Sequence, residues 1–109
     1  MVVKMVMKMN KFKGTPGPWE MKPEEVDKHY IRIRGTQLGW RYKVANVLTP
    51  FYEGVHEREA KETRANAQLI AASPEMLEAL QIICFFEDIS SAQREIAEAA
   101  IAKALGESQ

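Results

Sequence analysis

The sequence predicts an α+β fold: a small N-terminal antiparallel sheet, followed by a C-terminal helical hairpin and a third helix. Two observations predict it. Apolar and polar residues alternate in the first half, as in HYIRIRG (29–35), which is typical of a half-buried strand. From 56 to 72 alanines become frequent and apolar residues recur at helical spacing. A chain of 109 residues has the size of one domain, which we place at 14–109, with 1–13 as an N-terminal extension or edge strand.

Two runs predict the strands of a hairpin. HYIRIRG alternates tyrosine and arginine against Ile31 and Ile33 and ends at Gly35. The proline-rich GTPGPW (14–19), which comes earlier, is predicted as a loop that holds Trp19 in a restricted backbone. After the turn TQLG, the run WRYKVANVL (40–48) predicts a strand with Trp40, Tyr42 and Val44 on one face and Arg41, Lys43 and Ala45 on the other.

The segment ANAQLIAASPEMLEAL (65–80) contains both a stop signal and a start signal for helices. Pro74 disfavours the helical conformation in the residue before it, which predicts the end of a helix near Ala72. Ser73 suits an N-cap, and Pro74 suits the first position of a new helix. Two helices joined by a tight corner are therefore predicted, with a single kinked helix as the alternative.

The predicted helix 74–86 is apolar around most of its girth, because only Glu75, Glu78 and Gln81 form a polar strip. A helix of this kind needs cover on more than one side. Another subunit or the last helix of the same chain would supply the cover, and the sequence leaves both alternatives open.

The last helix is predicted over 91–105. Ser90 and Gln93 have the spacing of a capping box, in which each residue bonds the backbone N–H of the other. Gly106 is the residue type favoured just beyond a helix end.

The charges balance, since fifteen Lys and Arg residues stand against fifteen Asp and Glu residues. Proteins that bind duplex DNA usually have a net basic face, so we expect no duplex DNA partner. Cys84 is the one cysteine, which excludes an intramolecular disulfide and fits a reducing cytoplasm. The start MVVKMVMKMN has lysines spaced through it, and no stretch approaches the ~18 apolar residues of a membrane span. We expect a cytoplasmic protein with no membrane partner.

The usual residue patterns for catalysis or metal binding are missing. His29 and His56 are the two histidines, and no CxxC or HExxH spacing accompanies them. Cys84 lies in the apolar run QIICFFED, where a packing role is expected rather than nucleophilic chemistry. No glycine-rich phosphate loop follows a strand. We therefore expect no metal, no cofactor and no enzymatic activity.

A set of flat and cationic side chains surrounds the predicted sheet and the start of the first long helix. Bases stack on aromatic rings and guanidinium planes, and arginine binds phosphate in a fork geometry. Each of these side chains also has an ordinary structural role, as a core tryptophan or a solvated arginine. Asn66 lies in an alanine-rich run, and the sequence leaves its role open: exposure to solvent, capping or contact with a ligand. The set comprises Trp19, Trp40, Tyr42, His56, Arg41, Arg58 and Arg64.

TPGPW (15–19) and ANAQLIAASPEMLEAL (65–80) together resemble the signature of a group of small phage and prophage proteins. Members of that group have TPGPW, a short β segment with a glycine turn, an ANAxLIAAxPExLEAL helix pair and a variable C-terminal helix. The resemblance covers residues 15–80. Residues 1–13 and the loop TPFYEGVHEREAKET (49–63) depart from the compact members.

The layout of this group is similar to that of the phage sponge proteins that defeat Thoeris defence. Those proteins sequester a cyclic ADP-ribose isomer, and some also bind cyclic oligonucleotides, in pockets between the subunits of a dimer or higher oligomer. The resemblance implies that His56 stacks on the adenine, although a typical sponge has Phe or Trp there. It also implies that Trp19 walls the pocket and that the helix at 65–66 contacts the base. With two arginines of that set, the candidate ligand-binding residues are Trp19, Arg41, His56, Arg64, Ala65 and Asn66.

The leading hypothesis is a phage anti-defence protein that sequesters a cyclic nucleotide immune signal without cleaving it. It would act in the host cytoplasm as a homo-oligomer, either a dimer or a multiple of dimers. One alternative is a protein–protein interaction module that docks the helix 74–86 on a host or defence protein. A second alternative is a weak single-stranded nucleic acid binder that uses Trp40, Tyr42, Arg32 and Arg34.

Overall fold

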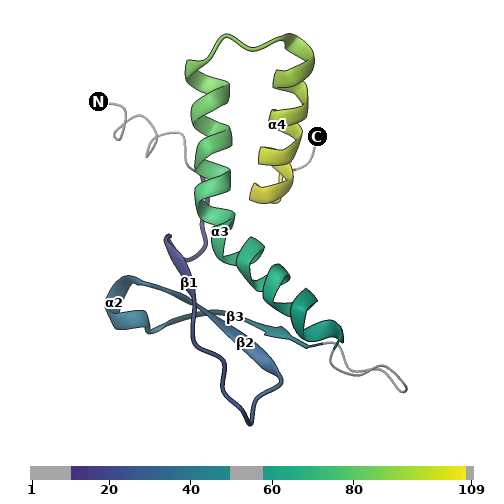
Figure 1. The fold of residues 1–109 in the computed structure, drawn as a ribbon. Helices are drawn as coiled ribbons and strands as arrows, with labels where there is room; N and C mark the ends of the chain where they lie inside the picture. The colour runs from purple at the N-terminus through teal and green to yellow at the C-terminus, as the bar shows by residue number, and fades with distance from the viewer. Residues whose placement is uncertain (1–10, 50–57, 108–109) are drawn as a thin grey trace. The chain divides into compact units, whose positions relative to one another are not determined.

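A computed structural model describes residues 11–49 and 58–107 (Figure 1). The predicted α+β class, with an antiparallel sheet before the helices, is confirmed. The predicted N-terminal strand or extension lies outside the described residues up to residue 10 and is irregular over 11–13. The elements are β1 (Trp19–Met21), β2 (Tyr30–Gly35), the short helical turn α2 (Gln37–Trp40), β3 (Tyr42–Leu48), α3 (Arg58–Phe86) and α4 (Ser91–Leu105).

The chain forms two compact units. The first, here called the sheet unit, comprises Thr15–Pro74 and contains the three strands and the first half of α3. The second, the helical unit, comprises Met1–Gly14 with Glu75–Gln109 and contains the second half of α3 and α4. The prediction of one domain over 14–109 stays a prediction.

The sheet unit has its core on one face of the sheet. The central strand β2 pairs antiparallel with both β1 and β3. Its Ile31 and Ile33 are 3% and 0% exposed, and they form the core with Val47 of β3 and Ala67 of α3. Because side chains alternate along a strand, burying these two isoleucines directs their neighbours in β2 to the opposite face. The first half of α3 therefore covers one face of the sheet (Figure 1).

Strand β3 contains a bulge. Arg34 lies opposite Lys43, but Ile33 lies opposite Ala45, so Val44 is an extra residue in β3. A bulge of this kind interrupts the alternation of side chains along the strand. The prediction that Lys43 and Ala45 share a face is therefore wrong. Lys43 lies on the side of Arg34, and Ala45 packs against the core.

Helix α3 runs without interruption through Pro74. The prediction of two helices that meet at a corner is wrong, and the alternative of one helix holds. Ser73 does not cap a new helix, because its hydroxyl donates a hydrogen bond of 3.1 Å to the carbonyl of Leu69, one turn back. Gly17 approaches so closely that a Cβ atom there would lie 2.8 Å from the Cβ of Pro74. Tertiary packing at Pro74 thus outweighs the local stop signal, although proline removes one helical hydrogen bond.

The helical unit is a hairpin of the second half of α3 and α4, which run side by side (Figure 1). The predicted capping box is confirmed, since Ser90 Oγ accepts from Gln93 N at 3.1 Å and Gln93 Oε1 accepts from Ser90 N at 3.0 Å. The helix ends as predicted at Gly106, which has a left-handed φ of 74°. Arg94 of α4 donates to the carbonyls of Cys84 and Glu87 at the end of α3. These hydrogen bonds join the two helices of the hairpin.

Part of α3 stays exposed within one chain. Leu77 and Gln81 are buried, whereas Met76, Ile83 and Phe86 are 48%, 42% and 40% exposed. The last helix of the same chain therefore does not supply all the cover that the predicted helix 74–86 needs.

By length and composition, the span Lys61–Phe86 is long and apolar enough to cross a membrane. The prediction that no stretch approaches this size is therefore wrong. Composition alone is weak evidence for insertion, because Glu75 and Glu78 fall inside the span and carboxylates are costly in a bilayer.

Removing the capping box tests the start of α4. We expect Ser90→Ala to lower the free energy of unfolding by about 1 kcal/mol, because the backbone N–H of Gln93 loses its acceptor, Ser90 Oγ. Urea unfolding followed by circular dichroism measures the change. Ser91→Ala, one residue further on, is the matched control, and an equal loss in both variants would contradict a capping role for Ser90.

Candidate functional site

The candidate site is the face of the sheet opposite the core, here called the open face. Tyr30, Arg32 and Arg34 of β2 point to it, since they alternate with the buried isoleucines. Across the strand pair, Asn46 lies opposite Arg32 and Lys43 lies opposite Arg34. The bulge in β3 is what puts Lys43 and Asn46 on the same face.

A hollow of about 280 Å³ lies over β2 and β3. It is lined by Tyr30, Arg32, Arg34, Lys43, Val44, Ala45 and Asn46. Three of these residues are cationic and none is acidic. Such a hollow favours anions, because the cations gather on a short stretch of two neighbouring strands.

The three cations differ in how they are bound. Arg32 forms an ion pair with Glu25 at 2.9 Å. Arg34 donates from Nη1 to the carbonyl oxygen of Trp40 at 3.0 Å and forms no ion pair within the described residues, although Glu20 of β1 lies opposite it in the register. Within residues 11–49 and 58–107, Lys43 has no ion-pair partner. Arg34 and Lys43 are therefore the cations most readily available to a ligand.

Two aromatic rings accompany the cations. The ammonium of Lys22 lies 4.6 Å from the centre of the Trp40 ring, and that of Lys28 lies 5.8 Å from the centre of the Tyr30 ring. Lys22 follows Met21, whose side chain packs against the core, so alternation directs Lys22 to the open face. The Trp40 ring is therefore next to the open face.

The sequence-predicted site residues lie in different surroundings. Trp19 is half-buried against the core, and its indole N–H donates to the Thr15 carbonyl at 3.0 Å. Arg41 is exposed where α2 meets β3. The exposed side chain of Arg64 on α3 is bound to Glu24.

The remaining predicted residues lie on or near the start of α3. Ala65 and Asn66 are exposed on α3, two residues and one residue before the core alanine Ala67. His56 lies outside the described residues. Of the predicted residues that the structure describes, none lines the hollow on the open face.

Sequence reasoning missed most of the open face as a site. The alternation in YIRIRG already placed Tyr30, Arg32 and Arg34 together, and Arg32 and Arg34 were named for nucleic acid binding. Lys43 and Asn46 could not be added, because strict alternation along β3 puts them on opposite faces. The bulge that brings Lys43 and Asn46 to the same face has no clear signal in the sequence YKVANVL.

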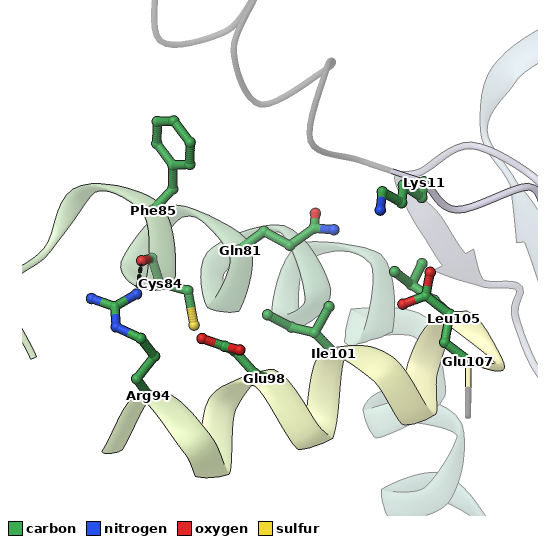
Figure 2. Close-up of a pocket in the computed structure, with 9 residues that line it drawn as sticks. All are labelled: Lys11, Gln81, Cys84, Phe85, Arg94, Glu98, Ile101, Leu105 and Glu107. Carbon is green, nitrogen blue, oxygen red and sulfur yellow. Dashed lines mark hydrogen bonds between the residues drawn. The ribbon is translucent and has the colours of Figure 1, made fainter. Parts of the chain in front are cut away.

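A second hollow, of about 240 Å³, lies within the helical unit (Figure 2). Cys84 and Gln81 face it from α3, and Ile101 and Glu98 from α4. Figure 2 shows the Cys84 thiol turned towards the Glu98 carboxylate, while Phe85 points away from α4. Its walls mix apolar side chains with charges of both signs, which favours no single class of ligand.

Metal-ligating residues do not cluster in the part of the chain that the structure describes, where no group of three or more His, Cys, Asp or Glu side chains could hold an ion. The chemistry offered by the open face is that of binding: guanidinium and ammonium groups for phosphate, and aromatic rings for flat groups.

Comparison with known protein families gives a match over most of the chain. A family model described as Salmonella phage P22 protein Y8K6 matches residues 7–108 of the 109. No curated protein and no solved structure matches significantly.

The pair of Glu24 and Arg64 gives a pH-dependent prediction. Arg64 donates to both carboxylate oxygens of Glu24, at 2.8 and 3.2 Å, and these hydrogen bonds lower the pKa of Glu24 from its usual 4.5. The ion pair therefore stabilises the folded state above the pKa that Glu24 has in the unfolded chain. This stabilisation is lost as the pH falls through the pKa of Glu24 in the folded state. We expect Arg64→Gln to raise the Glu24 pKa, measured by carboxyl carbon NMR. Arg41→Gln is the control, and an unchanged Glu24 titration in Arg64→Gln would contradict the assignment.

Proposed function

The chain belongs to the Salmonella phage P22 protein Y8K6 family, and from this premise we propose that it binds a cyclic nucleotide signal of host defence without cleaving it. The protein would act in the cytoplasm of the host cell and need no metal or cofactor. The observation that carries the proposal is the hollow over Arg34 and Lys43 on the open face.

The open face supports a phosphate-bearing ligand in two ways. Charge-assisted hydrogen bonds from arginine to phosphate are about twice as strong as neutral ones, and Arg34 and Lys43 lie directly opposite each other. The face also has Tyr30 beside the hollow, for contact with the sugar or the base. Binding of duplex DNA needs a longer row of cations than this face has. The proposed ligand is therefore not duplex DNA.

Sequestration sets a demand on affinity. A protein that removes a signal without turnover must bind it more tightly than the concentration at which the signal acts. A nanomolar dissociation constant corresponds to about 12 kcal/mol. A hollow of about 280 Å³ is small beside the roughly 300–1,000 Å³ of pockets that enclose whole ligands, which favours a second copy completing the site.

The second half of α3 supports that second copy. Met76, Ala79, Ile83 and Phe86 are all exposed and recur at intervals of three, four and three residues, which aligns them along one stripe of the helix. We call this the apolar stripe. Large and small side chains alternate in its first three positions, so a second helix running antiparallel can set Met76 of one copy against Ala79 of the other. We propose that the stripe joins two copies of the chain.

Binding is tested by calorimetric titration with cyclic ADP-ribose isomers, cyclic di-AMP and cyclic trinucleotides, with chromatography to check that each ligand stays intact. We expect Lys43→Gln to weaken binding about tenfold or more, because one charge-assisted contact is lost. Arg41→Gln, an exposed arginine outside the hollow, is the control.

Three outcomes of the titration count against the proposal. No heat with any ligand removes the function. Weakening by Arg41→Gln but not by Lys43→Gln moves the site away from the open face. Tighter binding of a single-stranded oligonucleotide, with affinity that falls steeply with salt, assigns the face to nucleic acid instead.

Assembly is tested by light scattering after size-exclusion chromatography over a range of concentrations. We expect Ile83→Glu to shift the protein to monomers, because a carboxylate would be buried without a partner. Ile96→Glu is the matched control, since Ile96 is 72% exposed on α4 and lies off the stripe. A wild-type protein that is monomeric throughout contradicts self-assembly and favours docking of the stripe on a foreign protein.

A further inference from the structure

We propose that Trp40 recognises the base of the ligand by stacking, with Lys22 and Arg34 as the groups that hold the tryptophan in place. This inference rests on the proposed function, since it adds a base-binding residue to the phosphate-binding face. It also replaces His56, which the family resemblance implied, with a residue whose surroundings are described.

The first argument is the conformation of the connection between β2 and β3. Leu38, Gly39 and Trp40 follow one another with φ values of 54°, 63° and 63°, all in the left-handed region. Glycine adopts this conformation freely, but in other residues it brings Cβ too close to the following carbonyl oxygen and is unfavourable. Residues held in this way cluster at sites of binding and catalysis, which is a reason to ask what the strained tryptophan does.

The left-handed conformation of Leu38 and Trp40 does not bury their side chains. Leu38 is 66% exposed and Trp40 is 40% exposed, so neither side chain reaches the core in return for its conformation. The predicted strand WRYKVANVL included Trp40, but the strand begins only at Tyr42. The connection therefore places the indole outside the strands, where it is partly exposed to solvent.

The second argument is what holds the indole. Arg34 fixes the backbone of Trp40 by donating to its carbonyl at 3.0 Å. Lys22, the residue after β1, lies 4.6 Å from the ring centre, which is within the range of a cation–π contact. Arg34 thus contacts the backbone of Trp40, and Lys22 contacts its ring.

The third argument links the ring to the hollow. Arg34 both lines the hollow and bonds to the backbone of Trp40, so the phosphate-binding and the base-binding parts share one residue. A nucleotide joins a base to a phosphate through one sugar. The arrangement therefore matches a ligand whose phosphate meets Arg34 and Lys43 while its base meets the indole.

Stacking on an aromatic ring tolerates any base, because every base has a π face. The indole surface left exposed beside Lys22 would therefore bind a purine more strongly than a pyrimidine through the larger overlap. The expected ligand class is a purine-containing cyclic nucleotide. Specificity among purines would need hydrogen bonds to the base edge, for which the exposed Gln37 on α2 is the nearest amide in sequence.

The test compares a ligand that has bases with one that has none. Cyclic di-AMP and ribose 5-phosphate are titrated against the wild-type protein, Trp40→Leu and Trp40→Phe. We expect Trp40→Leu to weaken the binding of cyclic di-AMP by about 5- to 150-fold, the range for loss of one stacked base. Trp40→Phe should retain part of the affinity. Ribose 5-phosphate should bind all three proteins equally.

A spectroscopic readout covers the case in which a variant fails to fold. The chain has two tryptophans, so wild-type protein labelled with 5-fluorotryptophan gives two fluorine resonances. Comparison with Trp40→Phe identifies the resonance of Trp40. We expect cyclic di-AMP to shift that resonance and to leave the resonance of Trp19 nearly unchanged.

The two levels of the proposal fail in different ways. If the wild-type protein binds neither cyclic di-AMP nor ribose 5-phosphate, the proposed phosphate-binding face is wrong. If cyclic di-AMP binds but Trp40→Leu leaves the ratio of the two affinities unchanged, the face stands and stacking on Trp40 is overturned. A ligand-induced shift of the Trp19 resonance alone also overturns it, and points to the side of the sheet that α3 covers.

Discussion

The burial of Ile31 and Ile33 beneath α3 is the constraint on which the rest of the sheet unit depends. These two side chains are the centre of the core, and they occupy alternate positions of the central strand. A strand that buries every second residue directs the residues between them to the opposite face. The same packing that stabilises the fold therefore presents tyrosine and arginine on the opposite face, without any further device to orient them.

Charge is distributed unevenly along a chain whose formal net charge is 0. Residues 19–48 contain six basic and four acidic side chains, a net +2, whereas residues 75–107 contain two basic and seven acidic ones, a net −5. The overall balance therefore hides a basic sheet and an acidic helical hairpin. An anionic ligand would be attracted to the strands and repelled by the hairpin, which makes whole-chain neutrality a poor guide to what the sheet binds.

The sequence predicted the features that depend on local pattern. Alternation gave β2 and the existence of β3, and the capping box gave the start of α4, because each signal acts within a few residues. The course of α3 through Pro74 could not be predicted in this way. There the proline is packed against Gly17, which is remote in sequence and leaves no room for a side chain of its own.

The candidate site was predicted only in part, for a similar reason. The arginines of β2 follow from alternation, but Lys43 joins them only through the bulge at Val44. Trp40 was expected in a strand, but it has a left-handed φ and contacts Arg34 of β2 and Lys22, which follows β1. Single-sequence patterns do not encode such cross-strand contacts.

The boundary between the two compact units falls inside α3, at Pro74, and not in a linker. Severing a helix there would leave its last carbonyls without donors on one side and its first amides without acceptors on the other. Gene rearrangements that exchange whole modules succeed best where few contacts cross the junction. The junction at Pro74 lies within the hydrogen-bonded backbone of a continuous helix, so the sheet and the hairpin are expected to be inherited together.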